Sequence, residues 1–515
     1  MRFARLACVL FTLLAGVSSR GDADVLGHAL KAAADPAGGG QPAQQSSNLS
    51  AWAGQARATT LPELLQLAVR QSPTLQNARL DIAVAEARIQ QTWARNDWLI
   101  GAKLTGSRTT SPNQGTTTSV GGSLDVSRLL PTGGTVGLHA GSAYSDTSGS
   151  FMKLFDGTSW TDNLDVSITQ PLLRGRGRDL FEANEVRATL ARDVVVLARR
   201  LVAIQTVQNL ISTYWDLVLA EQTVAITQGS LDLAKERLRV TQIGADGGKV
   251  PRSEIPAVLQ VIATREEDVL NGELGVLNAS IALRRASGMP IGSGELGLRV
   301  ATDLDTKDQP FELGPLVERA YAASPELAEL AKQDTSATID IAVTENGLLP
   351  QLDAALSIGP SGTDPKFGEA WKNLAEFKSI AVTGSLTFAQ SLGQNDVRGR
   401  AREQRELRRK LTVNAVDLRA QIAQTMSRAV AQLELARRRV TLSQRAIALA
   451  NENTKIETDR FNLGKATNFD VLNRLEELRQ AELRKAQALI DWHKAEVVIH
   501  SLTGDLLPMY GVAVD

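Results

Sequence analysis

The sequence of this chain contains two related halves. Residues 61–75 read LPELLQLAVRQSPTL and residues 313–327 read LGPLVERAYAASPEL, at an offset of about 252 residues. Later matches, such as Gly248-Lys249 with Gly464-Lys465, have an offset of about 216 residues. The first half therefore carries about 36 extra residues, which we place as an added β-hairpin at about 124–160. Two copies of one extended unit are predicted, not about three ordinary domains.

Helical periodicity dominates both halves. The two longest helices are predicted at about 179–243 and 397–463, and the first of them carries two apolar stripes, which implies neighbours on two sides. About 65 residues at 1.5 Å each give a helix of roughly 95 Å. Shorter helices are expected at about 61–94, 253–286, 313–346 and 468–502. We expect Ser72-Pro73 and Ser324-Pro325 to interrupt two of these, because proline removes a backbone donor. Two short helices, end to end, would then lie beside each long one.

Residues alternate between apolar and small polar types in the stretches before each long helix. In the second half, Ile380, Val382 and Leu386 alternate with Ala381 and Thr383. This pattern is typical of membrane β-barrel strands, although a soluble strand with one buried face shows it too. The stretches near 111–118, 145–160 and 359–378 are rich in Gly, Ser, Thr and Pro, and we expect them to be exposed connections.

One chain supplies four to six such strands. That number is too small to close a barrel with a water-filled lumen. Open strand edges cannot face lipid, so several chains must share the barrel. The sequence therefore predicts an oligomer.

The N-terminus has the features of a secretory signal. Arg2 and Arg5 precede an apolar run from Leu6 to Val17, and small residues follow, so we predict a signal peptide at 1–23. A flexible leader is expected at 24–60 because that stretch is rich in Ala, Gly, Gln, Pro and Ser. Cys8, within the signal, is the only cysteine. No other apolar stretch reaches about 18 residues, so we expect no transmembrane helix.

Composition and motifs give no support for an enzyme. The formal net charge is −1, which does not favour nucleic acid as a partner. The four histidines, His28, His139, His493 and His500, lack metal-ligand spacing. We therefore expect no catalytic residue, no metal and no cofactor.

The segment from Arg460 to Leu472, RFNLGKATNFDVL, resembles the hairpin motif of the TolC-type outer-membrane efflux protein family. A looser copy lies at 248–255, and Gln170-Pro171-Leu172-Leu173 also resembles the family. The resemblance covers about residues 61–505. It implies a mainly α fold with a transmembrane β-barrel portion, in which long helical hairpins of a homotrimer form an α-barrel tunnel that continues into a shared barrel. The usual family barrel has twelve strands, and the extra hairpin departs from that number.

The resemblance also implies a location and partners. The barrel would lie in outer-membrane lipid and the helices in the periplasm. The hairpin tips would meet a periplasmic adaptor protein and an inner-membrane pump or ABC transporter. The residues expected to contact the adaptor are Gly248, Lys249, Arg252, Arg460, Gly464 and Lys465.

A pore constriction is expected at the same tip. Three copies of Asp470 would form an acidic ring, which favours cations. Family members often carry a second aspartate one turn later, where this chain has Asn473. A simpler role for Asp470 is stabilisation of a helix N-terminus.

Two functional hypotheses follow from the sequence. The first is a passive exit duct for efflux or type I secretion, and the second is a periplasmic coiled-coil adaptor or structural rod without a channel. For the duct we expect a first repeat at 61–290 and a second at 312–505, with a linker at 291–311 and a tail at 506–515. The β segments fall at about 98–170 and 351–390, and the hairpin tips at about 244–252 and 462–468.

Overall fold

The computed structural model describes residues 58–112, 115–149, 157–291, 297–300 and 311–512. The predicted signal peptide, nearly all of the leader, and most of the linker at 291–311 lie outside these ranges, as do Cys8 and His28.

The first half begins with two helices, α4 (Leu61–Gln71) and α5 (Pro73–Thr92). They are separated at Ser72, whose extended backbone (φ −62°, ψ 118°) precedes Pro73 at the first position of α5. A short 3₁₀ turn, η2 (Trp93–Asn96), leads into four strands: β2 (Leu99–Ser111), β3 (Gly115–Leu129), β4 (Thr135–Ser148) and β5 (Gly157–Pro171). The long helix α6 (Arg178–Asp246) and the returning helix α7 (Glu254–Ser287) follow.

The second half has the same order of elements with fewer strands. Helices α8 (Leu313–Ala323) and α9 (Pro325–Asn346) are separated at Ser324. Strands β7 (Gln351–Asp364) and β8 (Ser379–Ala389) flank the short helix α10 (Phe367–Ala375). The long helix α11 (Asn395–Asn462) and helix α12 (Asn468–Thr503) complete the half.

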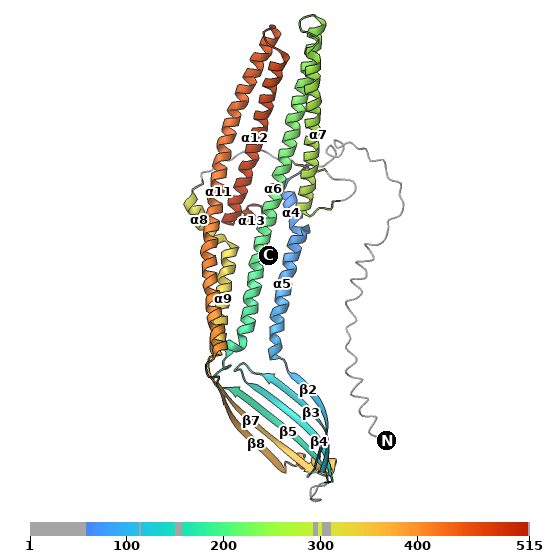
Figure 1. Ribbon diagram of the computed structural model, residues 1–515, viewed down its shortest axis with the longest axis vertical. Helices are drawn as coiled ribbons and strands as arrows, with labels where there is room; N and C mark the ends of the chain where they lie inside the picture. The colour runs from blue at the N-terminus through green and yellow to red at the C-terminus, as the bar shows by residue number, and fades with distance from the viewer. Residues whose placement is uncertain (1–57, 113–114, 150–156, 292–296, 301–310, 513–515) are drawn as a thin grey trace, which may run out of the picture. The chain divides into compact units, whose positions relative to one another are not determined.

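The helices pack side by side as predicted. Helices α5 and α7 both lie along α6, while α9 and α12 both lie along α11 (Figure 1). Helix α6 also contacts α9 and α12, so the layer runs α5–α6–α9–α11 near the sheet and α7–α6–α12–α11 toward the hairpin turns. The 69 residues of α6 correspond to roughly 100 Å. Each long helix therefore crosses both levels and ties them together.

Three apolar cores hold this layer together, and the smallest joins α6 and α7 around Leu231 and Val258. The larger of the other two joins α4, α6, α7 and α12 around Leu210, Tyr214 and Leu217 of α6. The second joins α8, α11 and α12 around Met426 and Ile499. By length and composition, α6 could cross a membrane, contrary to our expectation that no helix would meet this criterion. Packed helices meet it as well, and α6 is the main contributor to the larger core.

The six strands form one antiparallel sheet in the order β2-β3-β4-β5-β7-β8. Our prediction of exposed connections near 111–118, 145–160 and 359–378 is largely wrong for the described residues, because β3, β4, β5 and β7 extend into these stretches and α10 occupies part of the last. Residues 113–114 and 150–156 lie outside the described ranges. Threonine and serine alternate with small residues there, so strands of this composition resemble loops in sequence.

Two short elements depart from the expected leader, linker and tail. Strand β1 (Ala58–Thr59) pairs in parallel with β6 (Arg299–Val300), so the end of the leader and part of the linker join in a small sheet. Helix α13 (Leu506–Met509) buries Leu506 and Leu507 in the larger core. The residues after 505 are thus partly structural.

Candidate functional site

The two hairpin turns have matching backbone geometry. In the first, the Lys249 amide donates to the Gly244 carbonyl at 2.8 Å, and in the second the Lys465 amide donates to the Arg460 carbonyl at 2.8 Å. Each turn has a glycine with positive φ, +69° at Gly248 and +71° at Gly464. Only glycine adopts this conformation without strain, so both turns require it. Both lie at the helical end remote from the sheet (Figure 1).

The charged residues predicted at the tips make few contacts within the chain. Arg252 lies 3.6 Å from Asp246 across the first turn, and Arg460 lies 3.2 Å from Glu457 within α11. Both arginines are largely exposed. Lys249 and Lys465 are both exposed in the single chain. The structure thus places the predicted contact residues at the two turns without assigning them a partner.

Asp470 forms a capping box with Thr467 at the start of α12. The Thr467 amide donates to Asp470 Oδ2 at 2.9 Å, and the Asp470 amide donates to Thr467 Oγ1 at 3.3 Å. The hydrogen bond from the Thr467 amide is the main reason that the pKa of the Asp470 carboxyl lies below its usual range. Asn473 is exposed one turn later. Asp470 is therefore ionised at neutral pH and stabilises the first turn of α12.

A buried polar contact, which the sequence did not reveal, joins the two hairpins below these turns. Arg237 of α6 donates through Nε to Oδ1 of Asn468 at 2.7 Å, and Thr241 donates to the same oxygen at 3.2 Å. The Arg237 guanidinium also lies 3.6 Å from the ring centroid of Phe461. Asn468 is fully buried, and burial lowers the pKa of Arg237 to about 10, which leaves it charged at neutral pH. We call Arg237, Asn468 and Phe461 the tip clip.

A second polar network joins α7 to α12. Arg265 bonds to Glu476 across the two hairpins and to Asp268 at 3.2 Å. Arg479 donates to both oxygens of Glu476 at 2.9 Å. Burial raises the pKa of Glu476, but the hydrogen bonds from Arg479, Gln480 and Arg265 outweigh it and hold the pKa at about 2. The tip clip and this network thus join the hairpins at separate points, and Lys494 of α12 adds an ion pair with Asp216 of α6.

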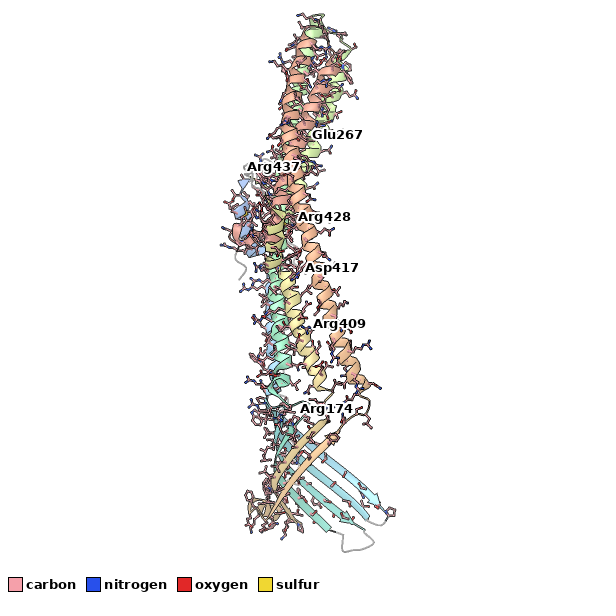
Figure 2. All side chains as sticks on the ribbon, turned by 90° about the vertical axis from the view of Figure 1, so that its left-hand side faces the viewer. Arg174, Glu267, Arg409, Asp417, Arg428 and Arg437 are labelled. Atoms are coloured by element: carbon pink, nitrogen blue, oxygen red, sulfur yellow. The ribbon has the colours of Figure 1, made fainter. Side chains whose placement is uncertain are left out.

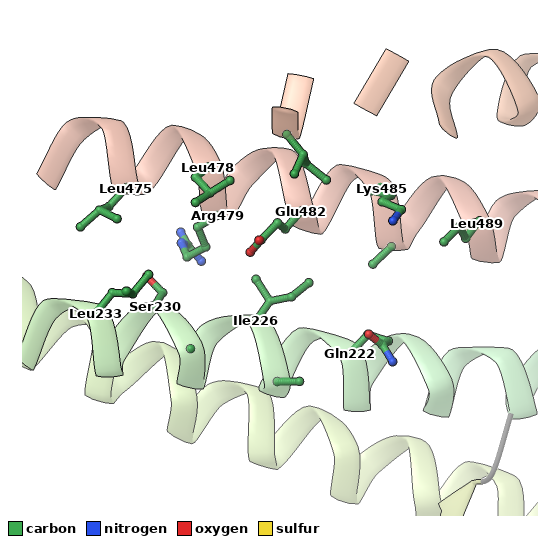
Figure 3. Close-up of a pocket in the computed structure, with 14 residues that line it drawn as sticks. Gln222, Ile226, Ser230, Leu233, Leu475, Leu478, Arg479, Glu482, Lys485 and Leu489 are labelled. Atoms are coloured by element: carbon green, nitrogen blue, oxygen red, sulfur yellow. The ribbon is translucent and has the colours of Figure 1, made fainter. Parts of the chain in front are cut away.

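A groove of about 650 Å³ lies between the same hairpins, mainly between α6 and α12 (Figure 3). Its apolar lining includes Ile226 and Leu478. Arg479, Glu482 and Lys485 follow α12 along it (Figure 3). Burial raises the pKa of Glu482, and Lys485 partly opposes this shift. The groove thus combines an apolar lining with a row of alternating charge.

The sheet has one apolar face. Paired residues in the five strand pairings share parity, so all even-numbered side chains lie on one face and all odd-numbered ones on the other. Apart from Leu99 and Leu129 at strand ends, the large apolar residues of the sheet that are exposed in the single chain all have even numbers: Ile100, Leu104, Val120, Leu124, Leu138, Leu164, Val166, Ile168, Leu356, Ile358, Ile380, Val382, Leu386 and Phe388. Charged side chains extend along the helices as far as Arg174 at the junction with the sheet (Figure 2).

Aromatic residues mark both ends of this apolar face. At the end remote from the helices, Trp160 lies 5.1 Å from Tyr144 and 5.0 Å from Phe367 of α10, measured between ring centroids. At the helical end, Trp98 and Phe388 are exposed. Strands of 11 to 15 residues are long enough to cross a bilayer, which needs roughly 9–11 residues. An apolar band with an aromatic girdle at each border is the signature of a membrane-spanning sheet.

No group of three or more His, Cys, Asp or Glu side chains suited to hold a metal occurs in the described part of the chain. His493 instead stacks on Trp215, with 4.1 Å between the ring centroids. His139 is 2.6 Å from Asp125 on the polar face of the sheet.

Comparison with known proteins identifies the class. Residues 64–289 and 316–505 match the family model described as outer membrane efflux protein, and the chain therefore belongs to this family of outer-membrane proteins. The Outer membrane efflux protein BepC of Brucella suis biovar 1 (strain 1330) is 23% identical over 303 residues. That alignment covers 58% of this chain and 63% of BepC, so it spans less than two thirds of the relative.

Solved outer-membrane channels share the fold. The CmeC outer membrane channel of Campylobacter jejuni is 13% identical, with a TM-score of 0.63 over 87% of this chain and 86% of CmeC. The open-state MtrE outer membrane channel of Neisseria gonorrhoeae is 16% identical, with a TM-score of 0.60 over 87% of this chain and 89% of MtrE. The long helical hairpins and the sheet therefore have the fold of solved outer-membrane channels, as the sequence predicted.

Proposed function

We propose that this protein is a passive exit duct through the outer membrane, assembled as a homotrimer and supplied by a periplasmic adaptor and an inner-membrane pump or ABC transporter. It acts without catalysis, metal or cofactor. The observation that carries the proposal is a sheet with a membrane-facing apolar band, joined to helices whose outer edges are apolar and meet no further helix in the described part of the chain.

The helical layer has two unlike edges. On one edge, α11 presents an exposed apolar stripe at seven-residue spacing: Leu435, Leu442, Leu449, Ile456 and Leu463. On the other edge, α7 presents Leu259, Leu270 and Leu274. Seven-residue apolar spacing is the pattern by which helices pack on partner helices. One edge of a copy meeting the opposite edge of the next copy generates a ring.

The sheet requires the same arrangement. Within the described residues, β2 and β8 each pair on one side only. Their free N–H and C=O groups cannot face lipid, because each unpaired group in hydrocarbon costs several kcal/mol. Pairing β2 of one copy with β8 of the next satisfies these groups and closes a pore.

The hairpin turns are the surface that faces the rest of an export system. We propose that Gly248, Lys249 and Arg252 of the first turn contact the adaptor, together with Arg460, Gly464 and Lys465 of the second. A photo-crosslinker at Lys249 or Lys465 is expected to capture an adaptor, and one at Lys372 on α10 is the matched control. No capture at either turn in an exporting cell would refute this contact.

We further propose that Asp470 and Asn473 line the narrowest part of the pore. The hydrogen bond from Thr467 leaves the Asp470 carboxylate charged. Asp470 can therefore stabilise α12 within each chain, while its three copies form a ring of carboxylates in the pore.

We also propose that residues 61–290 and 312–505 are the two repeats, preceded by a signal peptide at 1–23.

Cysteine crosslinking tests the assembly. Leu270→Cys on α7 and Leu449→Cys on α11 are separated within one chain by α6 and α12, so a disulfide between them must join two copies. Oxidation of the double variant in membranes is expected to give a ladder that ends at a closed trimer. Leu449→Cys alone is the control. A ladder ending at a dimer, or monomer only, would contradict the trimer.

A periplasmic adaptor or rod remains the alternative to a channel. It is disfavoured because a water-soluble rod would expose the apolar band of the sheet, with its aromatic borders, to water.

A further inference from the structure

Strands β3 and β4 are full members of the sheet. Strand β3 pairs with β2 from Ser127 to Gly115, and β4 pairs with β5 from Thr135 to Thr147. These two strands have no counterpart between β7 and β8, so they are the added hairpin of the first half. The hairpin runs from Gly115 to Ser148 and begins earlier than the predicted 124–160. The two strands therefore widen the wall and do not form a hairpin above it.

The turn between β3 and β4 is anchored to the base of α6. The Thr132 carbonyl accepts from the Gly177 amide at 3.2 Å and from Gln170 Nε2 at 3.1 Å. At Gly133, which has a φ of +86°, an added Cβ would lie 2.2 Å from the Gly175 carbonyl oxygen. The turn between β3 and β4 therefore packs tightly against the residues that connect β5 to α6.

The extra strands continue the two faces of the sheet. Leu124 of β3 and Leu138 of β4 lie on the even-numbered apolar face, while Asp125 and His139 bond to each other on the other face. The alternation is required only where one face of the hairpin contacts an apolar environment. It therefore favours a hairpin that lies in the bilayer over one that lies outside it.

The width of the sheet matches that of the helical layer. Strands about 4.8 Å apart and tilted by about 40° each occupy about 6.3 Å of circumference, so six span about 38 Å and four about 25 Å. Four helices about 9 Å apart span about 36 Å. Six strands thus continue the helical wall of the same chain without a step.

We infer that three copies close a single barrel of eighteen strands, in which β2 of each copy pairs with β8 of the next. This inference rests on the proposed homotrimer. The backbone diameter is about 36 Å, against about 24 Å for twelve strands. With about 5 Å of side chain on each wall, about 26 Å stays open instead of about 14 Å. The barrel therefore admits any solute that the helical tunnel admits, and selection by size lies at the hairpin tips.

Electron cryomicroscopy of the full protein in lipid nanodiscs tests the strand count directly. Threefold symmetry with eighteen strands is expected. A threefold assembly with twelve strands and the β3–β4 hairpin outside the wall would overturn this inference and leave the duct standing. A twofold assembly, or no closed barrel, would overturn the homotrimer itself.

Labelling from the outside measures the opening. Ser385→Cys lies on the odd-numbered, lumen-facing side of β8, and Val382→Cys lies on its lipid-facing side as a matched control. A maleimide polymer about 20 Å across is expected to label Ser385→Cys and not Val382→Cys in intact cells, since it fits a lumen of about 26 Å. Failure to label Ser385→Cys, when a small maleimide does label it, would refute the wide barrel.

Removal of the extra hairpin gives the converse test. Deleting residues 112–148 removes β3 and β4 and leaves four strands in each chain. In an assembled deletion variant, the same polymer is expected to be excluded from Ser385→Cys while the small maleimide still reacts. Equal labelling by the polymer with and without the hairpin would contradict the inference. If the variant does not assemble, the strand count of the full protein decides.

Discussion

Asn468→Ala is predicted to open the helical tip. Asn468 supplies the acceptor for the buried Arg237 guanidinium, and burial already lowers the pKa of Arg237 to about 10. The Asn468 oxygen and the Phe461 ring compensate in part for the water that the Arg237 charge has lost. A hydrogen bond to a charged group contributes about 1.5–3 kcal/mol, which corresponds to a shift of roughly 10- to 150-fold between joined and separated hairpins. Separation lets Arg237 regain water, so the shift favours the open tip.

Arg237→Met is expected to counteract the opening caused by Asn468→Ala. It removes the buried charge and keeps an apolar side chain against Phe461. Replacing a buried charged group by an apolar one of similar volume is often neutral or stabilising. The double variant with Asn468→Ala is therefore expected to be nearly as closed as the parent protein, because no charge is then left unpaired.

Single-channel recording in a planar bilayer measures the open fraction of each variant. Asn468→Ala is expected to raise it strongly, and Arg237→Met to leave it low. Arg239→Ala is the control, since Arg239 is exposed and, among the described residues, its side chain bonds only to Glu236. An Asn468→Ala channel as closed as the parent, or one that Arg237→Met fails to rescue, would refute the tip clip.

Three further perturbations test separate parts of the structure. Glu476 has a pKa of about 2, below its ordinary 4.5, so it contributes up to about 3 kcal/mol above pH 4.5 and loses this as the pH falls toward 2. Thermal unfolding of Glu476→Gln should show a weaker pH dependence in that range, and curves parallel to the parent's would exclude this link. Asp470→Asn removes the charge and keeps an acceptor for the α12 cap, so it should reduce cation selectivity, measured as reversal potential, with little change in melting temperature. An unchanged reversal potential would leave Asp470 with its capping role alone. Leu217→Ala, in the fully buried core, should lower the free energy of unfolding by about 2–5 kcal/mol, whereas Leu392→Ala at an exposed position should change it by less than about 0.5 kcal/mol. Equal unfolding midpoints for these two variants would contradict the assigned core.

The sequence predicted the features that depend on local spacing. The interruptions at Ser72-Pro73 and Ser324-Pro325 follow from proline chemistry, and the structure separates the helices there. The alternation of Ile380, Val382 and Leu386 predicted one apolar face of β8, which the register confirms. Such features depend on a few neighbouring residues, so they can be recognised without knowledge of the fold.

The tip clip could not be predicted in the same way. Arg237 and Asn468 are 231 positions apart and meet only because two separate hairpins lie side by side. Helix α10 was missed because its apolar residues, such as Ala370 and Leu374, are buried by the sheet surface beneath them. In a stretch rich in Gly, Ser and Thr, so short a helix depends on tertiary packing more than on intrinsic propensity.

The channel is tested most directly by locating two parts of the chain relative to the outer membrane. These are the end of the sheet remote from the helices and the hairpin turns. Lys372→Cys lies on α10, which joins β7 to β8 at the end of the sheet remote from the helices, and Lys249→Cys lies at a hairpin turn. In intact cells, a membrane-impermeant maleimide polymer wider than the lumen of about 26 Å is expected to label Lys372→Cys, and to label Lys249→Cys only after the outer membrane is permeabilised. Labelling of both positions, or of neither, before permeabilisation would contradict a sheet that spans the outer membrane with its helices in the periplasm.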